Sequence, residues 1–181
     1  MDLPAFRYHP DPIRSGSVTV SDNTCKCCGQ QRGYIYSGPT YNEGEDLDDG
    51  LCPWCVADGA AHAKFDVIFM DTNEIADDVP AAVIAELEQR TPGYNSWQQE
   101  EWRACCGDAA AFLTPAGDKE LRLREFPHVR SGLLKYLTTE EDMAGDEIQE
   151  LMDSLNRDGG PTAYVFKCLH CGKYLYHVDY P

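Results

Sequence analysis

The sequence predicts an α+β protein with zinc-ribbon-like cysteine knuckles on short antiparallel strands and several packed helices. Three observations predict this class. Pairs of cysteines separated by two residues occur three times in the 181-residue chain. Short segments that favour β structure lie near these pairs, and two longer acidic segments have the apolar spacing of amphipathic helices. The chain is long enough for one ordinary domain or two small ones.

The composition fits a globular cytoplasmic protein. Apolar residues make up 43% of the chain and charged residues 25%, which excludes wholesale disorder. No apolar run approaches the ~18 residues of a membrane-spanning helix, and Met1 to Pro4 shows no secretory leader. Nine cysteines without a leader indicate reduced thiols and metal ligands before they indicate disulfides.

The net charge narrows the class of partner. Lys and Arg total 15 and Asp and Glu total 31, so the chain carries −16. Nucleic acids and anionic membranes are poor partners for such a surface. A basic protein is the favoured partner, because long-range attraction would steer it to the surface. Solubility alone is an equally good explanation of the charge.

The first predicted lobe, residues 1–64, contains two matched cysteine pairs. Cys25 and Cys28 form one pair, Cys52 and Cys55 form the other, and 23 residues lie between the pairs. Two such turns complete a tetrahedral sulfur shell, which predicts one structural Zn²⁺. Short strands are expected over 17–20 and 34–36. The acidic loop 42–50 lacks the ordered series of ligands of a calcium site. It is interpreted as a solvated loop, with an interaction patch as the second interpretation.

A redox function is the main alternative for the second pair. Cys52-Pro53-Trp54-Cys55 looks like a glutaredoxin-type motif, which would make the protein a thiol oxidoreductase. That motif needs a buried strand before it, whereas 48–51 reads as a turn. Acidic surroundings would also raise the thiol pKa. Cys27 is interpreted as a bystander.

The second predicted lobe, residues 65–181, carries the third cysteine pair. Cys168 and Cys171 lie between the predicted strands 163–167 and 174–180. A second Zn²⁺ there would need two more ligands. Because adjacent residues rarely point to one ion, one of Cys105 and Cys106 is expected, together with a carboxylate or a histidine; the available histidines are His128, His170 and His177. The alternative is a hairpin whose cysteines are small core residues.

Other elements of this lobe follow from periodicity. We expect strands over 65–70 and 121–124, and an amphipathic segment between Trp97 and Trp102. One helix begins at Pro80, and another is capped by Thr138 or Thr139. Two acidic windows of the lobe, residues 65–89 and 140–156, contain no Lys or Arg. Each is either a solvated face or a docking face for a basic partner. The candidate contacts are Asp71, Glu74, Asp77, Asp78, Glu140, Glu141, Glu147 and Glu150.

The sequence contains no catalytic signature. It has no phosphate-binding glycine loop, no nucleophile elbow and no metalloprotease helix motif. Four thiolates around a zinc ion would also leave no open position for water or substrate. The prediction is therefore a binding protein and not an enzyme, with the oxidoreductase and a regulatory zinc module as alternatives.

A set of motifs along nearly the whole chain resembles the CbrC family, a small bacterial family. The resemblance rests on the opening segment 3–12, Cys25-x-x-Cys28-Gly29, Cys52-Pro53-Trp54-Cys55, Trp97-Gln98-Gln99, Cys106-Gly107-Asp108 and Cys168-x-x-Cys171-Gly172. It implies a role in tolerance of colicins, and it favours Cys106 over Cys105 as the shared ligand. Together with the charge, it predicts an immunity protein that neutralises a basic toxin domain, most plausibly a nuclease, by direct binding.

Overall fold

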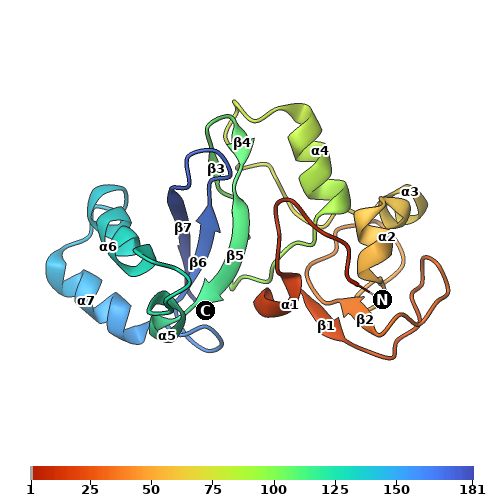
Figure 1. Ribbon diagram of the computed structural model, residues 1–181, viewed down its shortest axis with the longest axis horizontal. Coiled ribbons are helices and arrows are strands. Elements are labelled where there is room, and N and C mark those ends of the chain that lie inside the picture. Colours follow the sequence, from red (N-terminus) through yellow and green to blue (C-terminus); the bar gives the residue numbers. More distant parts are fainter. Residues whose placement is uncertain (1) are drawn as a thin grey trace.

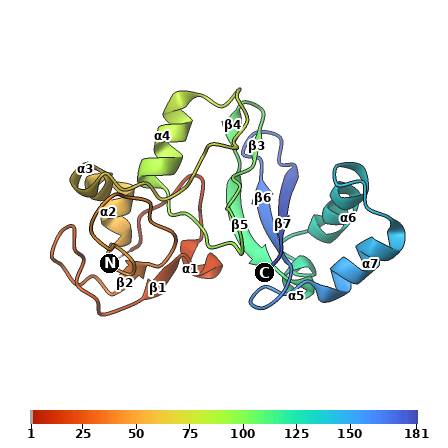
Figure 2. The same ribbon diagram turned by 180° about the vertical axis from the view of Figure 1, so that it is seen from behind.

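The computed structural model describes residues 2–181 and confirms the α+β class (Figure 1). Its strands form three antiparallel sheets, ordered β1-β2, β3-β4 and β5-β6-β7. The three-stranded sheet lies in the middle of the molecule. The N-terminal elements lie on one side of it and helices α5 to α7 on the other, as both views show (Figures 1 and 2).

The N-terminal lobe contains the two predicted short strands. Strand β1 (Val18–Val20) pairs with β2 (Tyr34–Tyr36), and three short helices accompany them: α1 (Pro12–Ser15), α2 (Pro53–Ala57) and α3 (Ala60–Phe65). The hydrophobic cluster of this lobe surrounds cysteine side chains. It also includes Val67 and Phe69, which lie beyond residue 64 in the sequence.

The central sheet confirms the predicted hairpin. Strand β6 (Thr162–Lys167) pairs with β7 (Tyr174–Asp179) on one side and with β5 (Ala111–Ala116) on the other. The short hairpin β3 (Ala104–Cys105) and β4 (Asp108–Ala109) precedes β5. An aromatic cluster that includes Tyr94 and Phe112, stacked 4.3 Å apart, covers one face of the sheet, next to helix α4 (Ala81–Arg90).

Three helices cover the opposite face. They are α5 (Asp118–Leu121), α6 (Val129–Thr139) and α7 (Gly145–Ser154). Their buried side chains, among them Leu133, Leu137, Leu151 and Met152, pack against Val165 and Tyr176 of the sheet. The sheet is therefore buried on both faces.

Two predicted strands are wrong. Residues 65–70 begin with the last residue of α3, after which Ile68 makes a single bridge to Tyr41. Burial of Val67, Phe69 and Met70 fixes this segment without a ladder. In 121–124, Leu121 ends α5, and Arg122 donates a hydrogen bond to Asp118 one helical turn before it. The apolar alternation there reflects a helix end.

The predicted cap of the last helix is also wrong. Thr138 and Thr139 end α6, and their hydroxyls donate to carbonyls one turn earlier. Helix α7 begins only at Gly145, where Glu147 accepts a hydrogen bond from the Ala144 N–H. A threonine hydroxyl can bond either end of a helix, and the sequence pattern did not distinguish them.

His9 provides a pH-dependent contribution to stability. It is fully buried, donates from Nδ1 to the Pro92 carbonyl and accepts at Nε2 from the Ser15 hydroxyl, each at 2.7 Å. Burial lowers its pKa to about 4, so the folded state keeps the neutral ring. Because the unfolded chain takes up the proton near pH 6.5, we expect stability to fall as the pH decreases from 6.5 to 4, by roughly 3 kcal/mol at most.

The corresponding measurement is urea unfolding at several pH values. The variant His9→Gln lacks the titrating ring and should lose less stability over the same pH range than the parent. Comparing the two proteins cancels contributions from every other group, including the thiols. Parallel pH curves for the two proteins would contradict the assignment.

Candidate metal centres

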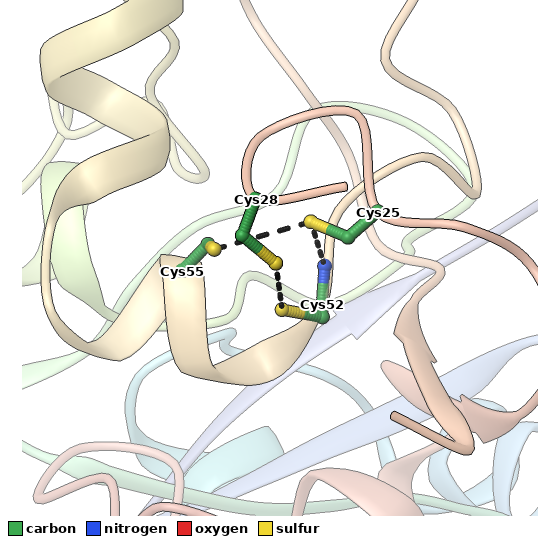
Figure 3. Close-up of side chains that lie close together, drawn as sticks. All are labelled: Cys25, Cys28, Cys52 and Cys55. Carbon is green, nitrogen blue, oxygen red and sulfur yellow. Dashed lines mark hydrogen bonds between the residues drawn. The ribbon is translucent and has the colours of Figure 1, made fainter. Parts of the chain in front are cut away.

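The first cysteine tetrad joins a loop to the start of a helix. Cys25 and Cys28 lie on a tight turn in which Gly29, at φ +71°, donates its N–H to the Cys25 carbonyl at 2.7 Å. Cys52 immediately precedes α2 and Cys55 lies within it, with Pro53 at the first helical position. Figure 3 shows the four side chains converging from these two segments.

The sulfur positions match one tetrahedral metal ion. Cys25 Sγ lies 3.9 Å from Cys55 Sγ, and Cys28 Sγ lies 3.8 Å from Cys52 Sγ. A tetrahedral ion with metal–sulfur bonds near 2.3 Å places its ligands about 3.8 Å apart. Disulfides would need about 2.05 Å. Cys25, Cys28, Cys52 and Cys55 could therefore hold one metal ion.

The thiols of this tetrad differ in the direction of their pKa shifts. Hydrogen bonds from the Cys52 thiol and from nearby backbone N–H groups lower the pKa of Cys25 to about 4. The hydrogen bond to Cys25 raises the pKa of Cys52, and burial raises that of Cys55. Ionisation is therefore favoured at Cys25 and disfavoured at Cys52 and Cys55. A divalent ion would allow all four sulfurs to ionise.

The surroundings of the Cys52–Cys55 pair favour a metal site over a redox motif. The pair does begin a helix, but the preceding Leu51 makes only an isolated bridge to Tyr36. Both sulfurs face cysteines of the other turn instead of an open surface. Cys27 lies beside the tetrad but is not one of its four members.

The second tetrad joins two hairpin turns. Cys105 and Cys106 lie at the β3–β4 turn, and Cys168 and Cys171 at the β6–β7 turn. Cys105 Sγ lies 3.6 Å from Cys106 Sγ and 3.8 Å from Cys171 Sγ. Burial would raise the pKa of Cys168, but the N–H groups of Cys171 and His170 outweigh it and lower that pKa to about 6. These four residues could hold a second metal ion.

Sequence reasoning missed Cys105. It expected only one of the two adjacent cysteines, on the premise that neighbours diverge. In the structure Cys106 and Gly107 both have positive φ, +60° and +68°, in a two-residue hairpin turn between the paired Cys105 and Asp108. This turn brings both sulfurs to one side. A residue followed by glycine between two short strands is a signal for such a turn and could have revealed it.

None of the three candidate histidines belongs to the tetrads. His170 Nε2 lies 2.7 Å from Asp108 Oδ2, and His177 Nδ1 lies 3.7 Å from Glu101. His128 immediately precedes α6 and has a left-handed backbone conformation, at φ +68°. The fourth member of the second tetrad is therefore a cysteine and not the expected histidine or carboxylate.

Asp108 connects the second tetrad to the N-terminal arm, the segment before α1 that includes Arg7 and Tyr8. It is 5% exposed and accepts hydrogen bonds from Arg7 at 2.6 Å, Tyr8 at 2.7 Å and the Ala109 N–H at 2.9 Å. Burial would raise its pKa, but Tyr8, His170 and Arg7 hold that pKa below its usual value. Asp108 lies on the β3–β4 hairpin and thus contacts both the β6–β7 hairpin, through His170, and the arm.

The two tetrads differ in exposure. In the first, Cys25, Cys52 and Cys55 are buried and Cys28 is half-buried, within a hydrophobic cluster. In the second, Cys106 and Cys171 are exposed and only Cys168 is buried. The first tetrad lies inside the core of its lobe, whereas the second lies at the surface.

The two acidic windows meet at one groove. Glu74 of the first window and Glu140 and Glu141 of the second line a cavity of about 1050 Å³ beside α6 and β7. The other candidate contacts lie elsewhere: Asp71 accepts a hydrogen bond from Gln99, Glu147 caps α7, and Asp77, Asp78 and Glu150 are exposed.

None of the helices in the described part of the chain has the length and apolar character of a membrane-spanning segment.

Fold and sites together define an α+β protein with two cysteine tetrads, each able to hold a metal ion. The chain belongs to the UPF0167 family, an uncharacterised protein family whose model matches residues 3–180. It is 45% identical over 179 residues to a UPF0167 protein of Mycobacterium bovis, covering 98% of this chain and 94% of the relative. A UPF0167 protein of Pseudomonas aeruginosa is 44% identical over 181 residues, covering 98% and 97%. No solved structure shows a significant match.

The family match corrects the resemblance stated above. The matching model and the similar proteins are all UPF0167, so the assignment to the CbrC family is wrong. Short cysteine turns recur in unrelated families, because metal geometry constrains their spacing. The prediction of colicin tolerance came from that resemblance and loses its basis with it.

Proposed function

We propose that the protein is a zinc protein with two tetrathiolate centres whose function is to bind a basic partner protein. The observation that supports the proposal best is the pair of cysteine tetrads: in each, all four sulfurs lie within 4.8 Å of one another, and two of the separations are between 3.6 and 3.9 Å. A closed set of four sulfurs stabilises a fold and leaves no coordination position for substrate. Binding therefore fits the sites better than metal-assisted catalysis.

Zinc is the metal that the donor sets favour. Tetrahedral sites of four thiolates take zinc or iron, and closed zinc sites are the common structural form. Such sites need reduced thiols, which agrees with the proposed cytoplasmic location.

Elemental analysis of the purified protein tests the metal. Two zinc ions per chain are expected, and a coloured iron protein or a metal-free folded protein would overturn the proposal. A mild thiol reagent should reach Cys52 and Cys55 only after a chelator is added. The alternative thiol oxidoreductase predicts a reactive thiol without chelator.

The groove between the acidic windows supports the class of partner. Residues distant in sequence, Glu74 and Glu140 with Glu141, place carboxylates on its walls. The net charge of −16 attracts cations toward the surface from a distance. The proposed partner is a basic protein segment, and no feature of the groove singles out a toxin or a nuclease.

A labelled lysine-rich peptide tests this part of the proposal. The double variant Glu140→Lys/Glu141→Lys should weaken its binding, and salt should weaken binding to the parent. The control Glu43→Lys/Glu45→Lys makes the same change of net charge on the acidic loop far from the groove. Equal losses in the two double variants would show that only net charge matters and would overturn the groove as the binding site.

A further inference from the structure

We infer that the groove beside β7 binds an extended segment of the partner as an added strand on the central sheet. The inference deepens the proposed function, since the basic character of the partner rests on that proposal. It adds the manner of recognition, which is main-chain pairing on one sheet edge.

The two edges of the central sheet differ. At the β5 edge, the Phe112 N–H donates to the Tyr8 carbonyl at 2.7 Å, so the N-terminal arm covers that edge. At the other edge, five consecutive residues of β7, from Tyr174 to Val178, line the groove. The order β5-β6-β7 leaves β7 without a neighbouring strand on this side.

The sheet register identifies the main-chain groups that face the groove. Pro115 of β5 lies opposite Tyr164 of β6, and proline has no N–H to donate. The N–H and carbonyl of Tyr164 therefore point to β7, where His177 lies opposite. By alternation, the main-chain groups of Tyr174, Tyr176 and Val178 point away from β6, into the groove.

A side-chain contact supports this orientation independently. Arg103 Nε donates to the Tyr176 carbonyl at 2.7 Å, so this carbonyl faces outward. Among the described residues, no hydrogen-bond partner contacts the outward main-chain groups of Tyr174 and Val178. Arg103 protects the middle of an edge that is otherwise open for pairing.

Two segments form the walls of the groove. Helix α6, through Lys135 and Tyr136, forms one wall, and the segment Glu101 to Ala104 forms the other. Tyr176 fixes the helix to the sheet, because its hydroxyl donates to the Val129 carbonyl at 2.9 Å. A strand paired with β7 would lie about 4.8 Å from it, between these walls.

The charges of the groove favour lysine or arginine in the bound segment. Arg103 pairs with Glu101 at 3.2 Å and Lys173 with Glu140 at 3.7 Å, which neutralises these groups. Glu74 and Glu141 add two further carboxylates against one further lysine, Lys135. The remaining charge is negative, in agreement with the sign of the whole chain.

The test uses labelled peptides of roughly eight residues, long enough to reach the free main-chain groups of Tyr174 and Val178 on either side of the carbonyl that Arg103 occupies. The first alternates valine and lysine, and fluorescence anisotropy should detect its binding to the full chain as purified. The second has the same sequence with N-methyl groups on alternate residues, which removes main-chain donors but keeps every charge. A loss of about tenfold or more is expected for the methylated register that pairs with β7.

A protein variant tests the same edge from the other side. Val178→Pro removes an outward N–H, and an edge strand tolerates proline at such a position. Its control, Val178→Ala, removes side-chain contacts but keeps the N–H. We expect about tenfold weaker peptide binding for the proline variant and about twofold or less for the alanine variant. Circular dichroism and metal content establish that both variants fold.

The outcomes separate the inference from the proposed function. If the valine–lysine peptide binds and neither N-methylation nor Val178→Pro weakens it, strand addition is overturned and a basic partner remains. If only an irregular lysine-rich peptide binds, strand addition is likewise overturned. If no cationic peptide binds, both fail. The peptide comparison remains decisive if Val178→Pro does not fold.

Discussion

The variant Cys55→Ser should unfold the lobe around the first tetrad and lower the zinc content from two ions per chain to one. The tetrad lies within the hydrophobic cluster that includes Leu47, Leu51 and Phe69, so an ion bound there would hold this core together. The free energy of binding structural zinc is free energy of folding, on the order of 10 kcal/mol. Limited proteolysis and elemental analysis measure the two effects.

Cys27→Ser is the matched control. Cys27 is a neighbouring half-buried cysteine that lies outside the tetrad. The control should keep two zinc ions and a protease-resistant lobe. A third variant, Cys106→Ser, should lose the exposed second ion and leave the N-terminal lobe folded. If Cys55→Ser keeps both ions, or if Cys27→Ser loses one, the assignment of the first centre is wrong.

The variant Asp108→Ala should destabilise the protein by about 2–4 kcal/mol and speed the loss of zinc from the second centre. Removal of the carboxylate leaves the buried Tyr8 hydroxyl without its acceptor and breaks the contacts of Arg7 and His170. Because Arg7 and His170 are half exposed, most of the cost comes from Tyr8. Chemical denaturation gives the stability, and a colorimetric chelator gives the rate of zinc release.

Two further variants separate the contribution of the Asp108 charge to stability from that of its hydrogen bond with Tyr8. Asp108→Asn keeps an acceptor for Tyr8 and removes the charge, so it should cost less than Asp108→Ala. Tyr8→Phe removes the other partner, and the double variant with Asp108→Ala should cost less than the sum of the two single variants. If the costs simply add, Asp108 and Tyr8 act separately and the proposed link between the arm and the hairpins is absent.

The sequence predicted the features that local spacing controls. The turns at Cys25–Cys28 and Cys168–Cys171 follow from short motifs with a following glycine, and the β6–β7 hairpin follows from two apolar runs around one of them. Helix α4 followed from its apolar stripe and the proline before it. Each signal spans few residues, so no knowledge of tertiary contacts was needed.

Features that depend on distant contacts were not predictable in this way. The place of Cys105 in the second tetrad depends on backbone at positive φ in a two-residue turn. The segment 65–70 is irregular because neighbouring elements bury it, and α6 has a pattern that did not stand out from its surroundings. The meeting of Glu74 with Glu140 and Glu141 at one groove depends on the packing of the whole lobe.

The spacing of the two tetrads sets an order for their assembly during protein synthesis. The first joins residues at most 30 positions apart, whereas the second joins residues 66 positions apart. Closing the longer loop costs roughly 0.7 kcal/mol more in chain entropy, a minor difference. Emergence from the ribosome matters more: the first set is available once residue 55 has emerged, and the second only after residue 171. If the first tetrad binds an ion, the nascent N-terminal lobe can therefore acquire it and fold before any of the three strands of the central sheet has emerged.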